Sequence, residues 1–108
     1  MKEITFLGSS LDDLREFPQD ARRDAGFALN EVQEGRDPPD WKPMKTVGAG
    51  VREVRVSDRA GIFRVIYVAN LNDTVLVLHA FAKKTEQTAK SDIDLAKSRL
   101  KQWKKEAK

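Results

Sequence analysis

The chain has 108 residues, of which 40% are hydrophobic and 34% charged, enough for one domain with a single modest core. It contains no cysteine, which excludes disulfides and thiolate nucleophiles or ligands, and its single histidine, His79, argues against a histidine-rich metal site. The longest apolar run, Val65–Ala69, is far shorter than the roughly 20 residues that a membrane helix needs. Because the first residues also lack a secretory signal, we expect a cytoplasmic protein with no membrane contact.

The charges divide the chain into an acidic first third and a basic remainder. Residues 1–40 carry 5 basic and 10 acidic side chains, a balance of −5, whereas residues 41–108 carry 15 basic and 7 acidic, a balance of +8. A basic region of this kind is typical of proteins that bind a polyanion, although a solvated lysine-rich helix gives the same count.

The acidic third predicts a short strand followed by a helical hairpin. Residues 2–7 alternate roughly between apolar and polar side chains, as a strand does. Ser10 with Asp13 resembles a capping box for a first short helix, and Pro18 suits the first turn of a second helix. Gly35 can end that second helix in a left-handed conformation.

The basic remainder begins with a loop and continues with three strands. Residues 37–43 are rich in proline and predict a loop, since they suit neither a helix nor a central strand. Residues 51–56, 62–69 and 74–82 are rich in β-branched and aromatic side chains and are separated by short turns. They therefore predict an antiparallel meander, whose last strand is apolar on both faces and should be covered on both sides.

The tail from residue 89 onward predicts a helix that Thr88 or Ser91 can cap. One apolar stripe follows it at helical spacing, formed by Ile93, Ala96, Leu100 and Trp103. This helix should lie on the sheet or on a partner. No repeat or linker divides the chain, so the expected fold is a single α+β domain over residues 1–108, in the order β-α-α-β-β-β-α.

Three arginines lie in strands that are otherwise built largely from valine and isoleucine: Arg52, Arg55 and Arg64. Because burial of an unpaired guanidinium is unfavourable, each should pair with a carboxylate, reach a sheet edge or line a concave surface. By strand parity Arg55 shares a face with Glu53, so an ion pair within the sheet is one interpretation, and Arg52 lies on the opposite face. Parity also places Arg64 and Tyr67 on opposite faces of their strand.

A second group of candidates lies at the end of the last strand. His79, Phe81 and Lys83 share one face by parity, and Lys84 follows where the strand ends. Cations beside an aromatic ring suit RNA, because cations neutralise phosphate and rings stack on unpaired bases. Each residue alone also has a purely structural interpretation: a hydrogen-bonded core histidine, a core phenylalanine or a solvated strand end. As the only histidine, His79 is a candidate general acid or base.

Motifs that bind common cofactors do not occur in the sequence. There is no phosphate-binding glycine loop, dinucleotide fingerprint or zinc-protease motif, and Gly48 and Gly50 form only an isolated pair. We therefore expect neither a cofactor nor a metal ion.

Three successive strand motifs resemble those of the RelE/ParE toxin superfamily. They are Gly50–Arg55, Gly61–Tyr67 and Leu78–Thr85, and residues 93–99 resemble the last helix of its HigB-like, phage-derived branch. The resemblance covers nearly the whole chain, including the acidic helical hairpin. It implies a RelE-like fold and the role of toxin in a type II toxin–antitoxin system.

The resemblance also implies an activity and a set of partners. It implies a ribosome-dependent mRNA endonuclease that inhibits translation without a metal, with the 2′-hydroxyl of the RNA attacking the phosphate. The implied partners are mRNA, the ribosome and a cognate antitoxin, which we expect to be of the helix-turn-helix type. Operator DNA would be contacted only through that antitoxin.

Site residues follow from the resemblance position by position. Arg64 matches an arginine to which we assign stabilisation of the phosphate, and Lys83 and Lys84 match a basic pair after the last strand. The expected catalytic residues are Arg64, Lys83, Lys84, His79 and Arg55. The expected substrate-binding residues are Arg52, Tyr67, Phe81, Thr85 and Lys90. Related nucleases often use a tyrosine or histidine in the closing segment, which this chain lacks, so the acid and the base stay open.

Three other functions are compatible with the same residues. ParE-like members of the superfamily act on DNA gyrase, although the basic cluster after the last strand favours the nuclease branch. A non-catalytic module that binds RNA or DNA would keep the basic rim and leave no cut ends in translated mRNA. A pure interaction domain would use the stripe from Ile93 to Trp103, and its association with ribosomes would depend weakly on salt.

Overall fold

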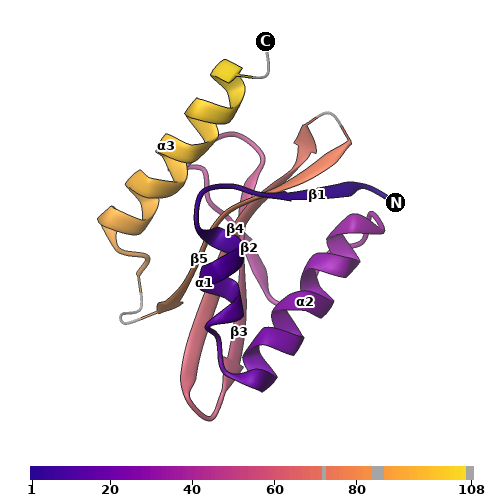
Figure 1. The fold of residues 1–108 in the computed structure, drawn as a ribbon, viewed down its shortest axis with the longest axis vertical. Helices are drawn as coiled ribbons and strands as arrows, with labels where there is room; N and C mark the ends of the chain where they lie inside the picture. The colour runs from indigo at the N-terminus through magenta and orange to yellow at the C-terminus, as the bar shows by residue number, and fades with distance from the viewer. Residues whose placement is uncertain (72, 84–86, 107–108) are drawn as a thin grey trace.

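The computed structural model describes residues 1–71, 73–83 and 87–106 and shows a sheet enclosed between helices (Figure 1). The elements are, in chain order, β1 (Glu3–Phe6), α1 (Ser10–Arg15), α2 (Gln19–Gln33), β2 (Trp41–Pro43), β3 (Val51–Asp58), β4 (Gly61–Leu71), β5 (Thr74–Lys83) and α3 (Lys90–Glu106). The α+β class and the three-stranded meander are confirmed. No described helix is long and apolar enough to span a lipid bilayer.

The five strands are arranged in the order β1-β5-β4-β3-β2. Strand β1 pairs in parallel with β5, and the remaining neighbours are antiparallel. Strand β2 was expected to be loop, and that prediction is wrong for residues 41–43, which pair with Val54, Glu53 and Arg52. Proline is tolerated there because β2 is an edge strand and needs no second ladder of hydrogen bonds. The prediction that these residues do not form a central strand is confirmed, because β2 lies at the edge of the sheet.

Two cores lie on opposite faces of the sheet. Helices α1 and α2 cover the first, whose buried side chains include Leu29, Val54, Val65, Tyr67 and Val77. Helix α3 covers the second, formed by Met44, Val47, Val51, Ile66, Val68, Leu76, Leu78, Ala96 and Leu100. The apolar stripe of α3 therefore packs on the sheet. The two central strands are covered on both faces, which is why their sequences are nearly continuously hydrophobic.

The helix ends agree with the sequence in part. Gly35 follows α2 with φ of 83°, the left-handed conformation that glycine adopts without strain. The expected capping box is wrong: Ser10 is buried within α1, where its hydroxyl donates to the carbonyl of Val77 at 3.2 Å. The hydroxyl of Ser9 donates instead to the carboxylate of Asp13, at 2.8 Å.

A bulge in β5 positions part of the candidate site. Ile66 pairs with His79, whereas the next residue of β4, Tyr67, pairs with Val77, so Leu78 is an extra residue in β5. Leu78 packs in the core beneath α3, and His79 also faces α3, where it contacts Asp92. The bulge thus directs two consecutive side chains to the same face of the sheet.

Candidate functional site

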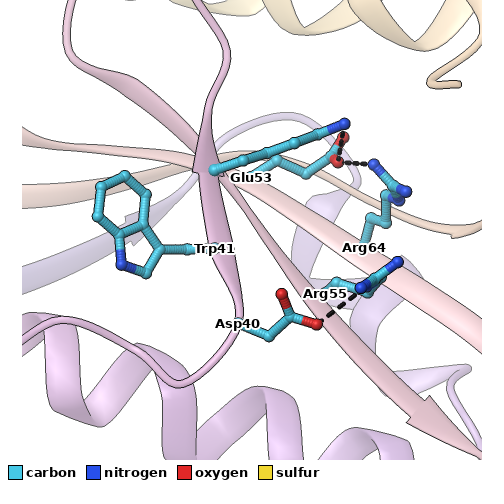
Figure 2. Close-up of a pocket in the computed structure, with 6 residues that line it drawn as sticks. Asp40, Trp41, Glu53, Arg55 and Arg64 are labelled. Carbon is cyan, nitrogen blue, oxygen red and sulfur yellow. Dashed lines mark hydrogen bonds and ion pairs between the residues drawn. The ribbon is translucent and has the colours of Figure 1, made fainter.

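A cleft of about 130 Å³ opens at the β2 edge of the sheet, on the face that α3 covers only in part. It is lined by Asp40, Trp41, Lys42, Glu53, Arg55 and Arg64 (Figure 2). Three cations and two carboxylates are thereby gathered from β2, β3, β4 and the residue before β2. In Figure 2 the ring of Trp41 points away from Arg64, so the indole does not face the charged side chains of the cleft.

The register of the strands explains why these side chains meet. Lys42 pairs with Glu53, and Glu53 pairs with Ile66, so the first two side chains lie in one row across the sheet. Arg55 pairs with Arg64, two residues further along the same strands and therefore on the same face. Neighbouring strands are only about 4.8 Å apart, so a long side chain from one row reaches the next.

The floor of the cleft is a buried ion pair between Arg64 and Glu53. The side chains are 3% and 0% exposed, and a nitrogen of the guanidinium, Nη1, contacts Oε1 of the carboxylate. Thr88 donates its hydroxyl to the other oxygen of Glu53 at 2.7 Å and lies 3.4 Å from Nη1 of Arg64. Thr88 therefore joins the segment before α3 to this pair. It lies two residues before Lys90, where α3 begins, and Ser91 lies inside the helix, so neither is at the expected cap position.

Two cations with exposed side chains lie at the mouth of the cleft. Lys42, whose side chain is 51% exposed, places Nζ 3.8 Å from Oε1 of Glu53. Arg55, 43% exposed, donates from Nε to Asp40 at 2.9 Å, and its backbone N–H donates to the carbonyl of Asp40 at 2.8 Å. Burial lowers the pKa of Lys42, and the nearby charges of Arg64 and Arg55 lower it further.

His79 and Phe81 extend the same face towards α3. Phe81 pairs with Arg64 across β4 and β5, and its ring stacks on that of His79 with 4.6 Å between centroids. Nε2 of His79 lies 2.7 Å from the carboxylate of Asp92 in the first turn of α3. His79 is therefore a largely buried contact between sheet and helix, and it does not line the cleft.

Arg52 and Tyr67 lie on the opposite face of the sheet, as strand parity predicted. They pair with each other across β3 and β4, and Tyr67 belongs to the core beneath α2. Arg52 donates to Asp37 at 2.9 Å, and its guanidinium carbon lies 3.9 Å from the centroid of the Trp41 ring. These two residues therefore do not share a pocket with Arg64.

The other described site residues lie at the end of β5 and at the start of α3. Lys83 pairs with Ile62 at the end of β5, on the face of Phe81 by alternation. Lys90 begins α3, is exposed and donates to Asp94 at 2.8 Å, which raises the pKa of Lys90. Lys84 and Thr85 lie outside the described residues.

Lys42 and the true partner of Glu53 were missed from the sequence. The suggested pair of Arg55 with Glu53 is wrong, because Arg55 binds Asp40 whereas Glu53 binds Arg64 and Lys42. Lys42 stands between two proline-containing segments that predict a loop, so only the pairing of β2 with β3 brings it to the cleft. The valine-rich surroundings of Glu53 were the one available signal that its carboxylate is buried.

This arrangement can stabilise negative charge. Three fixed cations face one small volume, and two carboxylates hold them in place and leave an excess of one positive charge among the lining side chains. A group with a lowered pKa, Lys42, stands beside them. Preorganised donors of this kind favour a transition state that gains negative charge, such as that of phosphate-ester cleavage.

Comparison with known proteins identifies similar sequences and folds. Residues 12–101 match the family described as "Phage derived protein Gp49-like (DUF891)". The fold is similar to that of a chain in the intact Escherichia coli RelBE toxin–antitoxin complex, with 17% identity, a TM-score of 0.59, and 79% of this chain and 100% of that chain covered. No curated protein matches the sequence.

Two further solved structures show the same likeness. A chain of the Mycobacterium tuberculosis RelBE2 toxin–antitoxin complex is 20% identical, with a TM-score of 0.53 and 76% of this chain and 98% of that chain covered. A mutant of Escherichia coli toxin RelE in the free state, in which two arginines are replaced by alanine, is 16% identical, with a TM-score of 0.54 and 94% and 96% covered. At these identities the structural likeness establishes the fold.

Proposed function

The chain belongs to the Gp49-like family of phage-derived proteins and has the RelE fold, and from this premise we propose that it is the toxin of a type II toxin–antitoxin system. Two of the similar chains come from complexes described as toxin–antitoxin complexes, which supports a protein partner that silences this chain. We propose a cognate antitoxin of the helix-turn-helix type, which alone would bring the pair to operator DNA.

The proposed activity is cleavage of mRNA on the ribosome. The observation that carries it is the convergence of Lys42, Arg55 and Arg64 on one cleft of a RelE-like sheet. The cleft holds a positive excess on the basic part of the chain, which suits a phosphate of a single extended strand. Phe81 pairs with Arg64 across the strands, and we assign to it the contact with an unpaired base.

The chemistry uses the nucleophile that RNA itself supplies. The 2′-hydroxyl attacks the adjacent phosphorus and a new O–P bond forms, while the bond from phosphorus to the 5′ oxygen breaks. The products are a 2′,3′-cyclic phosphate and a 5′-hydroxyl end. Arg55 at the mouth contacts the phosphate oxygens, Arg64 on the floor adds positive charge behind it, and Lys42 adds a further charge once it has accepted the proton of the 2′-hydroxyl.

Lys42 is the proposed proton acceptor for the 2′-hydroxyl. Its lowered pKa raises the fraction of neutral amine at a given pH relative to an ordinary lysine. His79 is assigned a positioning role, because it is bound to Asp92 and lies outside the cleft lining. The proton that the 5′ oxygen needs is supplied by solvent or by the ribosome.

Controlled expression in bacteria tests this proposal. We expect growth arrest that the antitoxin relieves, together with new 5′-hydroxyl ends in mRNA that disappear when translation initiation is blocked. Growth arrest without new mRNA ends, accompanied by broken or relaxed DNA, would assign the chain to the gyrase-directed branch instead. Absence of both effects would contradict the toxin proposal.

A further inference from the structure

A second cleft lies on the opposite face of the sheet, where the end of α2 approaches β3 and β4. Its volume is about 260 Å³, and it is lined by Lys2, Val32, Gly35, Arg36, Asp37, Gly50, Arg52, Tyr67 and Ala69. Three of these side chains are cations and one is a carboxylate. The cleft shares no lining residue with the cleft of Arg64, so the two are separate sites.

The hydroxyl of Tyr67 is a buried polar group among the residues that line this cleft. Tyr67 is 1% exposed, and among the described residues its hydroxyl makes no well-formed hydrogen bond, although the guanidinium of Arg52 lies close enough to interact with it. Buried polar groups in folded proteins are nearly always hydrogen-bonded, so this hydroxyl needs an explanation. A phenol keeps its proton at neutral pH and can donate it in a hydrogen bond; burial raises the pKa of Tyr67 further, and the nearby guanidinium of Arg52 opposes that rise.

The cations of the cleft already show which chemistry they bind. Arg52 holds the carboxylate of Asp37 at 2.9 Å, and Arg36 holds Glu31 through two nitrogens at 2.8 and 3.0 Å. The ammonium of Lys2 donates to the carbonyl of Ala69 at the inner end of the cleft. Arginine forks recognise carboxylate and phosphate alike, whereas three cations and a neutral hydroxyl around one space favour a group with more than two oxygens.

The surrounding charge argues against a nucleic-acid strand in this cleft. Glu31, Glu34 and Asp37 lie at or beside the rim formed by the end of α2, within the acidic first third of the chain. A long polyanion would have to pass all of these carboxylates, whereas a single phosphate group need replace only Asp37, which lines the cleft and binds Arg52.

We propose that this cleft is a binding site for the phosphate group of a small phosphorylated molecule, with Tyr67 and Arg52 as its donors and Lys2 and Arg36 as flanking charges. The inference does not depend on the function proposed for the chain. It gives a role to two residues that the sequence singled out and that the fold separates from Arg64.

Titration of the purified chain with inorganic phosphate at constant ionic strength tests the proposal, followed through the backbone amide resonances of Gly35 and Gly50. We expect saturable shifts at both glycines, and acetate at the same ionic strength should bind at least about tenfold more weakly. Absence of saturable shifts, or acetate binding as tight as phosphate, would overturn the assignment.

Two variants separate a binding role from a structural one. Tyr67→Phe removes only the hydroxyl, and Arg52→Gln removes the charge, and each should weaken phosphate binding by about tenfold or more. Because the Tyr67 hydroxyl makes no well-formed hydrogen bond among the described residues, Tyr67→Phe should unfold at no lower temperature than the parent without phosphate. Arg59→Gln, which removes an exposed charge in the turn between β3 and β4, is the matched control and should bind phosphate like the parent. Parental binding by Tyr67→Phe would refute the donor role.

Discussion

Arg64 of β4 and Glu53 of β3 form an ion pair in which both side chains are almost completely removed from solvent. A buried pair of this kind adds little stability relative to packed hydrophobic side chains, because desolvation offsets the attraction between the charges. Loss of one partner is different, since it leaves the other charge buried without its counter-ion. We infer that Glu53 holds the guanidinium of Arg64 in place at the floor of the cleft.

Glu53→Gln tests the structural part of this account. The variant keeps the shape of the side chain and removes the charge that neutralises Arg64, so we expect the free energy of unfolding to fall by about 3–5 kcal/mol. Denaturant unfolding measures it. Asp37→Asn, which weakens the more exposed pair with Arg52, should lower it by no more than about 1 kcal/mol. Equal losses in the two variants would show that burial of the Arg64–Glu53 pair is not decisive.

Lys42→Gln and Arg55→Gln test the catalytic part without disturbing the core. Both side chains are half exposed, so stability should change by less than about 1 kcal/mol, whereas the rate of mRNA cleavage should fall by about 10²–10³ in each. The rate is measured with ribosomes under single-turnover conditions. Arg59→Gln provides the control for loss of one surface charge, and its rate should equal that of the parent.

Asp92→Asn tests the attachment of α3 to the sheet. The substitution weakens the hydrogen bond with His79, so we expect a loss of about 0.5–1.5 kcal/mol and faster amide hydrogen exchange in the first turn of α3. Asp94→Asn removes the same charge from the same half of the helix, where the carboxylate pairs with Lys90 and has Lys97 nearby. Faster exchange to the same extent in both variants would mean that helix-end charge, rather than His79, holds this turn.

The raised pKa of Tyr67 predicts that the folded protein loses stability in alkali. Because burial raises its pKa in the folded state, the unfolded chain releases the phenolic proton first as the pH rises through about 10. The stability of the parent relative to Tyr67→Phe should therefore be constant below that pH and decline above it. Urea unfolding between about pH 9 and 11 measures the difference. Parallel curves for the two proteins would show that the phenol has the same pKa in both states.

The sequence was sufficient for most of the fold because the pattern of hydrophobic residues is strong where both faces of a strand are covered. Residues 62–69 and 74–82 are nearly continuous apolar segments, and they became the two central strands β4 and β5. The stripe from Ile93 to Trp103 likewise indicated which side of α3 packs on the sheet. The short edge strand β2 carries no such pattern, because only three residues pair and one is a proline.

The candidate site was only partly predictable because it depends on register between strands. Parity along one strand correctly separated Tyr67 from Arg64, since it needs no knowledge of the partner strand. It could not show that Lys42 pairs with Glu53, or that the Arg64 guanidinium reaches diagonally to that carboxylate. Likewise, the sequence suggested Thr88 as a cap of the last helix, whereas α3 begins two residues later and the hydroxyl donates to Glu53, a long-range contact that local motifs do not report.

The most direct test of the central claim, that Lys42 and Arg55 at the mouth of the Arg64 cleft drive mRNA cleavage, is a single-turnover assay with purified ribosomes carrying a defined mRNA. The parent should generate fragments with 5′-hydroxyl ends. The double variant Lys42→Gln/Arg55→Gln should be folded, should bind the antitoxin, and should cleave at least about 10²-fold more slowly. Cleavage by the folded double variant at the parental rate would contradict the account.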